Sequence, residues 1–196
     1  YGKRLHGNRL VSGAVRLAGM GYAIPGTVIA VGVMIPLAWF DNSIDSWMRA
    51  HYGLSTGLLL SGTLAALLFA YLVRFLAVAL QAVESGLARI RTSMDEAARS
   101  LGYRPVEVLR RVHAPLMRSS LLTGALLVFV DILKELPATL VLRPFNFNTL
   151  AVRAYELASD ERLADAATAS LAIVLAGIIP VILPSRAITQ ARPGHA

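Results

Sequence analysis

Cysteine is absent from this 196-residue chain, and charged and aromatic residues are both scarce. Without cysteine, the chain forms no disulfide, no zinc–thiolate site and no cysteine-ligated iron–sulfur cluster. Charged residues make up only 16% of the chain, whereas a typical soluble domain carries about 25%. Hydrophobic residues make up 56%, and the mean hydropathy is +0.59. This balance favours a protein whose surface faces lipid, with a soluble all-helical core as the alternative.

The formal net charge of +7 does not by itself indicate a nucleic-acid partner. Nucleic-acid-binding domains gather their basic residues on one face, often with exposed aromatic side chains between them. Here the Lys and Arg residues lie between apolar runs, and aromatic residues make up only 7% of the chain. We therefore expect no nucleic-acid partner.

Four apolar stretches are long enough to cross a bilayer as helices, which takes about 20 residues at a rise of about 1.5 Å each. They lie at 21–40, 54–73, 119–142 and 166–188. Their prolines are compatible with membrane helices because neighbouring helices satisfy the freed carbonyl groups. We predict an all-α fold, a polytopic transmembrane helix bundle, with residues 1–196 forming part of one membrane domain. The chain begins at Tyr1 in what reads as the middle of a longer segment, so we expect a fragment.

The basic residues indicate how these stretches are oriented. Thirteen of the nineteen Lys and Arg residues lie in the leading segment, the loop between the second and third stretches, and the tail, whereas four lie in the two alternate loops. Positive residues concentrate on the cytoplasmic side of membrane proteins. The leading segment, the loop between the second and third stretches, and the tail are therefore predicted to be cytoplasmic. Arg74 follows the second stretch, so we expect it at the cytoplasmic interface, with its helix continuing to about residue 91. A buried functional arginine is the costlier alternative.

The loop at about 84–118 has the pattern of a helix, a turn and a second helix. Residues 94–101 are good helix formers, and Gly102 can adopt the left-handed conformation that ends a helix. Pro105 suits the first turn of the next helix, because the N–H that it lacks would be unpaired there. The apolar side of that second helix is predicted at Val106, Leu109 and Val112.

The same loop carries a spaced motif that is similar to the cytoplasmic signature of ABC importer permeases. In that signature, Glu-Ala-Ala, three residues, Gly and nine further residues precede Ile-x-Leu-Pro. The spacing here is complete, with Val112 in place of Ile and Ala114 in place of Leu. The matching residues are Glu96, Ala97, Ala98, Gly102 and Pro115.

The resemblance implies that the helix around this motif docks into a cleft of a separate ATPase, whose closure on ATP moves the spans. It implies four partners: an ATP-binding subunit, a periplasmic solute-binding protein, a second permease half or copy, and the lipid bilayer. It also implies a multi-pass protein of the inner membrane, with the coupling loop in the cytoplasm. The chain has no G-x-x-x-x-G-K-[ST] phosphate-binding loop. We therefore expect it not to be an enzyme, with ATP hydrolysed by the partner subunit.

Two further stretches, 16–33 and 131–161, are similar to ferric-iron importer permeases, in which two homologous halves commonly share one polypeptide. This chain resembles the C-terminal half. The resemblance implies transport of ferric iron from the periplasm to the cytoplasm. Thiamine, polyamine and phosphonate permeases share much of the same pattern and remain alternatives.

The third apolar stretch contains three charged residues, Asp131, Lys134 and Glu135. Asp131 and Glu135 are four residues apart and would share one face of a continuous helix. Charges inside a span are expected to face a wet cavity or a partner, and carboxylates are suitable hard ligands for Fe(III). We predict that these three residues line the translocation pathway, with an internal ion pair as the alternative. A proton-coupled secondary transporter or channel would also use such charges, but it would leave the loop motif unexplained.

His51 and His113 lie outside the four stretches and have no second metal ligand at a suitable spacing. We expect both at the surface, and we expect no metal site and no other cofactor. Because no histidine falls inside an apolar stretch, an intramembrane enzyme has little support. Phe145 and Phe147 are predicted to anchor an outer loop at the membrane interface.

Overall fold

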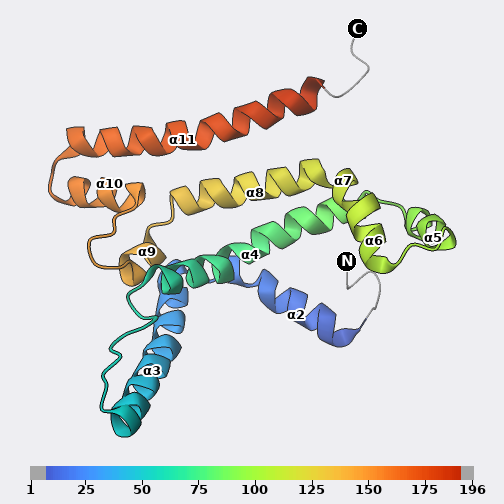
Figure 1. Ribbon diagram of the computed structural model, residues 1–196. Helices are drawn as coiled ribbons and strands as arrows, with labels where there is room; N and C mark the ends of the chain where they lie inside the picture. The colour runs from blue at the N-terminus through green and yellow to red at the C-terminus, as the bar shows by residue number, and fades with distance from the viewer. Residues whose placement is uncertain (1–7, 191–196) are drawn as a thin grey trace.

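The computed structural model describes the backbone of residues 8–190 and the side chains of residues 8–182. The first seven and last six residues, and the side chain of Arg186, lie outside the described residues. They hold part of the basic leading segment and tail on which the predicted orientation depends. Within the described range the chain is helical and contains no strand, which confirms the predicted all-α class (Figure 1).

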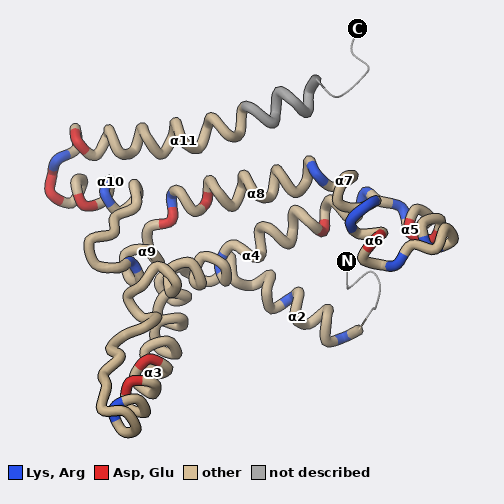
Figure 2. The backbone as a smooth tube through the Cα atoms, viewed as in Figure 1, with Lys and Arg blue, Asp and Glu red and all other residues tan. Residues whose placement is uncertain are grey.

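Three helices are long and apolar enough to cross a membrane. They are α3 (Gly26–Tyr52), α4 (Leu64–Ala88) and the Leu163–Ile182 part of α11 (Leu163–Gln190). A fourth is obtained if Pro105–Leu116 and α8 (Arg118–Leu133), which meet at a bend of 74°, are taken together. Charged residues gather in the loop around α5 and α6, around α10 and in the later part of α3, while the rest of the long helices is largely uncharged (Figure 2).

Helix α4 begins ten residues later than the sequence predicts, because residues 53–63 are not helical. Three glycines in this segment have positive φ angles, Gly53 at 64°, Gly57 at 63° and Gly62 at 71°. The segment therefore takes left-handed turns that a membrane helix does not allow.

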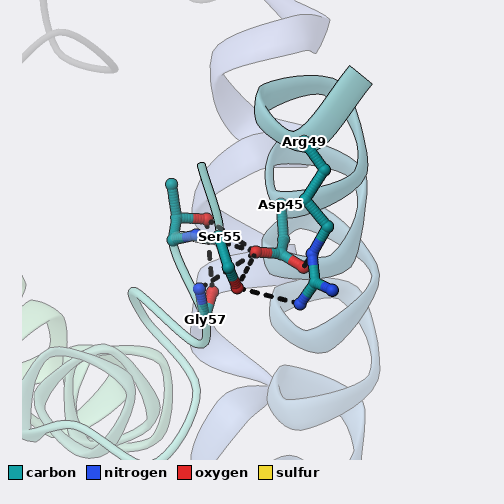
Figure 3. A network of polar contacts seen from close by, with 5 residues as sticks. Asp45, Arg49, Ser55 and Gly57 are labelled. Atoms are coloured by element: carbon teal, nitrogen blue, oxygen red, sulfur yellow. Dashed lines mark hydrogen bonds and ion pairs between the residues drawn. The ribbon is translucent and has the colours of Figure 1, made fainter. Parts of the chain in front are cut away.

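Two carboxylates of α3 bind the backbone of this non-helical segment. Asp45 Oδ1 accepts hydrogen bonds from the backbone amides of Thr56 and Gly57, at 2.7 and 3.1 Å (Figure 3). One turn earlier in α3, the fully buried Asp41 accepts from the amides of Leu60 and Ser61, at 3.1 and 2.7 Å. These bonds pair backbone amides that have no helical partner in this segment.

The third apolar stretch forms a broken helix rather than a continuous one. Helix α8 ends at Leu133, and α9 (Pro137–Leu142) begins after three intervening residues with Pro137 in its first turn. A proline at that position cannot continue the hydrogen-bond ladder of α8 but fits the start of α9. The 16 residues of α8 span about 24 Å, short of the roughly 30 Å of a bilayer core.

The hydrophobic core lies where α3, α4 and α9 meet. Its buried residues are Ile29, Ala30, Val33, Leu67, Ala70, Tyr71, Phe75, Ala138 and Leu142. Towards the other end of α4, small residues let α8 approach closely: a Cβ atom added to Gly124 would lie 2.5 Å from the Cβ of Ala82. Helix α10 (Leu150–Ser159) packs along α11, whose apolar surface is otherwise largely exposed. The remaining N-terminal elements, α2 (Arg9–Gly19) and η1 (Gly21–Ala23), pack against α4.

Candidate functional site: the α4–α8 loop and a buried charge pair

Four short helical elements connect α4 to α8 and stand together at one end of these helices, opposite α9 and α10 (Figure 1). They are α5 (Thr92–Ser100), α6 (Pro105–Val108), η2 (Leu109–His113) and α7 (Ala114–Leu116). This is the segment that carries the spaced Glu-Ala-Ala…Gly motif.

The predicted turn at Gly102 is present, and its φ is +83°. The amide of Tyr103 bonds the carbonyl of Ala98 at 3.1 Å, and that of Gly102 bonds Arg99 at 2.9 Å, so the last turn of α5 is capped by backbone. Pro105 opens α6 as predicted, and Glu107 Oε2 accepts the amide of Arg104 at 2.8 Å. The sequence therefore identified this turn from local chemistry alone.

The second helix of the loop differs from the regular helix expected. After one turn of α6 the chain takes a π-helical turn, η2, and returns to α-helix at Ala114. Pro115 lacks the N–H that would bond the carbonyl of Arg111 in a regular helix. The π-helical turn and the proline both interrupt the regular hydrogen-bond ladder at this point.

The motif residues are presented to different surroundings. Glu96, Ala97 and Pro115 are exposed, whereas Ala98 points inward and is 5% exposed. Two large apolar side chains nearby, Leu101 and Val106, are 78% and 74% exposed. Leu109 is also exposed and Val112 is half-buried, so much of the predicted apolar side lies open. An exposed apolar patch of this kind is typical of a surface that meets a partner.

His113 is not at the surface, contrary to the prediction. It is fully buried, and its Nε2 contacts Oδ1 of Asp95, which is also buried. This contact joins α5 to η2 and makes the loop one packed unit. Sequence reasoning missed it because the two residues are eighteen positions apart and no local spacing relates them. His51, in contrast, is exposed as predicted and stacks on Trp47.

A charge pair lies in the core near the middle of α4. Arg74 Nε is 3.1 Å from Glu135 Oε2, and the two side chains are 18% and 6% exposed. The predicted interfacial position of Arg74 is therefore wrong: the residue lies well inside α4, and its side chain points into the bundle. The alternative, a buried arginine, is the arrangement found. The reason is tertiary, since Glu135 supplies the countercharge that makes burial tolerable.

Asp131 and Glu135 were predicted to share one face of a continuous helix. They do not, because α8 ends at Leu133. Lys134, the first residue after α8, is exposed and pairs with the largely buried Asp131 of α8, with Nζ 3.0 Å from Oδ1. Glu135 instead turns into the core towards Arg74. The break thus separates a pair that reaches the surface through Lys134 from a pair that lies in the core.

Further polar contacts fix the buried pair in place. Arg74 Nη1 donates to the carbonyl of Ile24 at 2.8 Å, and Glu135 Oε1 accepts from the amide of Ala138 at 3.1 Å. Gly26 lies so close that an added Cβ would be 2.7 Å from Glu135 Oε1. Next to this pair, the hydroxyls of Tyr71 in α4 and Thr139 in α9 lie 2.5 Å apart. The network joins the start of α3, the middle of α4 and the α8–α9 break.

A second polar cluster orders the connection between α9 and α10. Arg143 bonds Asn148, and its Nη2 lies 3.0 Å from Oε1 of Glu156. Phe145 at the tip is 98% exposed, whereas Phe147 packs against the core, so only Phe145 is free to act as the predicted interfacial anchor. Among residues 8–182, no three His, Asp or Glu side chains gather as a metal site would require.

The family to which the chain belongs follows from its comparison with known sequences. The family model of the binding-protein-dependent transport system inner membrane component matches residues 2–191. The chain belongs to this family. It is thus a polytopic ABC-type permease component, as the loop motif had indicated.

The names of curated relatives that are similar to this permease chain refer to two different substrates. It is 28% identical over 168 residues to the Fe(3+)-transport system permease protein FbpB 2 of Haemophilus influenzae. This match covers 86% of the chain and 30% of the relative. It is 33% identical over 124 residues to PhnV of Salmonella typhimurium, a permease protein provisionally assigned to 2-aminoethylphosphonate transport. That match covers 63% of the chain and 46% of the relative. The chain thus spans less than half the length of these relatives.

Proposed function

We propose that this chain forms part of the membrane path of an ATP-driven importer and receives the motion of a separate ATPase through the α4–α8 loop. The observation that carries the proposal is the form of that loop. It presents Glu96 and Ala97 on the exposed side of α5, with Leu101 and Val106 exposed just after that helix, on a unit fastened by the Asp95–His113 contact. A rigid, partly apolar projection of this kind suits insertion into a cleft of another protein.

The proposed orientation places this loop in the cytoplasm and the α9–α10 connection in the periplasm. The loop region is rich in arginine, as expected for a cytoplasmic segment of a membrane protein. The ordered tip at Phe145 then faces the side from which a solute-binding protein delivers its load.

Ferric iron is the substrate we propose, because the iron-transport relative matches across most of the chain. The PhnV relative supports a phosphonate as the second candidate. We propose Asp131, Lys134 and Glu135 as residues of the translocation pathway, and we assign them different roles. Lys134 is exposed, so the Asp131–Lys134 pair is placed to meet a passing solute through the lysine, and Glu135 acts from within the wall through Arg74. Because its countercharge holds Glu135, a proton-coupled carrier is the weaker reading.

The docking proposal is tested by single-cysteine crosslinking, which the absence of native cysteine makes clean. Ala97→Cys places a thiol on the exposed side of α5, and Ala98→Cys places one on its buried side. Each is combined with cysteines along the cleft of the ATPase subunit in the assembled transporter. Crosslinking at Ala97 well above that at Ala98 is expected. Equal or absent crosslinking at both positions contradicts docking through this helix.

The substrate proposal is tested by uptake of radiolabelled Fe(III) into cells with and without the gene for the full-length transporter. Uptake that requires the gene, and that thiamine, polyamines and 2-aminoethylphosphonate do not reduce, is expected. Gene-dependent uptake of labelled 2-aminoethylphosphonate instead would assign the second substrate and leave the permease function intact.

A further inference from the structure

We propose that Arg74 and Glu135 form a mechanical joint that carries motion from the coupling loop, along α4, to the α8–α9 break on the far side of the bundle. This proposal rests on the proposed function, since it assumes that the loop receives ATPase motion. It assigns to Arg74, Glu135 and Gly26 a positioning role that is separate from contact with the solute.

Helix α4 is suited to transmit displacement because it is continuous between the two sites. It runs without a break from Leu64 to Ala88 and leads into α5 after three residues. Arg74 lies fourteen residues before its end, which corresponds to about 21 Å along the axis. The charge pair and the end of α4 that leads into the coupling loop thus lie on one continuous helix, visible as the long α4 ribbon in Figure 1.

At Arg74 this helix holds two other elements at once. Its Nε faces Glu135 in the α8–α9 break at 3.1 Å, and its Nη1 donates to the carbonyl of Ile24, just before α3, at 2.8 Å. Glu135 in turn accepts the amide of Ala138 at the start of α9. Movement of α4 is therefore passed to the start of α3 through a hydrogen bond and to α9 through an ion pair and the Glu135–Ala138 hydrogen bond, rather than through sliding apolar surfaces.

The α8–α9 break supplies the flexible point that a joint requires. Three residues, Lys134 to Leu136, interrupt the helix, and Pro137 prevents the ladder from closing across them. Helix α9 can therefore change its angle to α8 without breaking helical hydrogen bonds. The joint lies at this flexible point, where a small displacement of α4 changes the direction of α9 and the connection beyond it.

An ion pair is a better joint than an apolar contact because it resists separation strongly. Parting the two side chains would leave each charge buried without a partner, which is far costlier than sliding two apolar groups apart. The contact also depends on geometry, since a Cβ atom at position 26 would lie 2.7 Å from Glu135 Oε1 and would require that side chain to shift.

The test uses the complete transporter, with its ATPase and binding protein, in proteoliposomes. Arg74→Gln and Glu135→Gln are compared with Arg162→Gln, which removes an exposed ion pair formed within three residues at the start of α11. For the two joint variants we expect a transporter that assembles and hydrolyses ATP. Its stimulation by loaded binding protein and its uptake per ATP fall about tenfold, a factor typical of coupling between sites. Arg162→Gln is expected to behave as the parent.

A gentler pair of variants keeps the proposal testable if the charge variants do not assemble. Gly26→Ala pushes a methyl group against Glu135, whereas Gly32→Ala, two turns along the same helix, meets open space. Reduced uptake per ATP in the first variant only is expected. Unchanged coupling in Gly26→Ala and the charge variants would overturn the joint, as would uptake losses that merely follow the amount of assembled transporter. Crosslinking at Ala97 reports separately whether the ATPase docks.

Discussion

At the scale of single residues, the buried Asp41 and the half-buried Asp45 organise backbone that no helix ladder satisfies. Asp41 accepts two amides of the non-helical segment, and Asp45 accepts two more together with the hydroxyl of Ser55. Both residues lie in the part of α3 beyond residue 40, where the predicted apolar span ends and the helix continues to Tyr52. Their role follows from the amides that they reach, and those amides are identified only once the chain is folded.

Asp41→Ala should therefore loosen the segment between α3 and α4. The substitution leaves the amides of Leu60 and Ser61 without their acceptor, at a cost of about 1–3 kcal/mol. The expected result is faster proteolysis between residues 53 and 63 and a lower unfolding temperature of the purified protein. Asn42→Ala, an exposed neighbour on the same helix, is the control. Equal proteolysis of both variants would show that Asp41 does not hold the segment.

At the scale of elements, the loop shows how far sequence reasoning reaches. The turn at Gly102 and the start of α6 at Pro105 were predictable, because each depends on one residue's backbone preference. The late start of α4 was not, because an apolar run with leucines looks the same in a helix and in a segment bound by distant carboxylates. The burial of His113 against Asp95 and of Arg74 against Glu135 also depends on residues far apart in sequence.

The left-handed turn at Gly102 gives a prediction about coupling. Gly102→Val forces a β-branched residue to a φ of +83°, which costs at least about 1–2 kcal/mol. It should tilt α5 and reduce transport per ATP hydrolysed while the spans stay assembled. Gly102→Asn is the matched control, since asparagine tolerates this conformation better than other residues. Uptake and ATPase assays on the reconstituted transporter measure the effect. Equal transport per ATP hydrolysed in Gly102→Val and Gly102→Asn would contradict the prediction.

At the scale of the whole molecule, the four apolar stretches predicted a polytopic helix bundle, and three long helices with a broken fourth element are found. What composition could not predict is how little of α11 the rest of the chain covers. The apolar window of α11 is only 6% buried, so its surface requires lipid or another membrane helix.

Leu171→Arg tests this requirement near the middle of the apolar part of α11, where Leu171 is 58% exposed. An arginine at the centre of a span costs about 2.5–3.5 kcal/mol in insertion. We expect a marked fall in the membrane-inserted fraction, measured by extraction and protease protection. Leu171→Met, which keeps the residue apolar, should insert normally. Normal insertion of the arginine variant would place this face against water.

The charge pair in the core also sets an order for synthesis. Arg74 leaves the ribosome 61 residues before Glu135, a delay of about 3–12 s at typical rates of synthesis. During that interval the charge of Arg74 has no partner, which disfavours insertion of α4 into the bilayer. Insertion becomes stable once Glu135 in the α8–α9 break pairs with Arg74. With a single cysteine introduced into α4, stalled nascent chains that stop before residue 135 should therefore leave that cysteine accessible to aqueous thiol reagents. Chains long enough for residues 135–142 to have left the ribosome should protect it, so the arrival of the partner carboxylate commits the N-terminal half to the membrane.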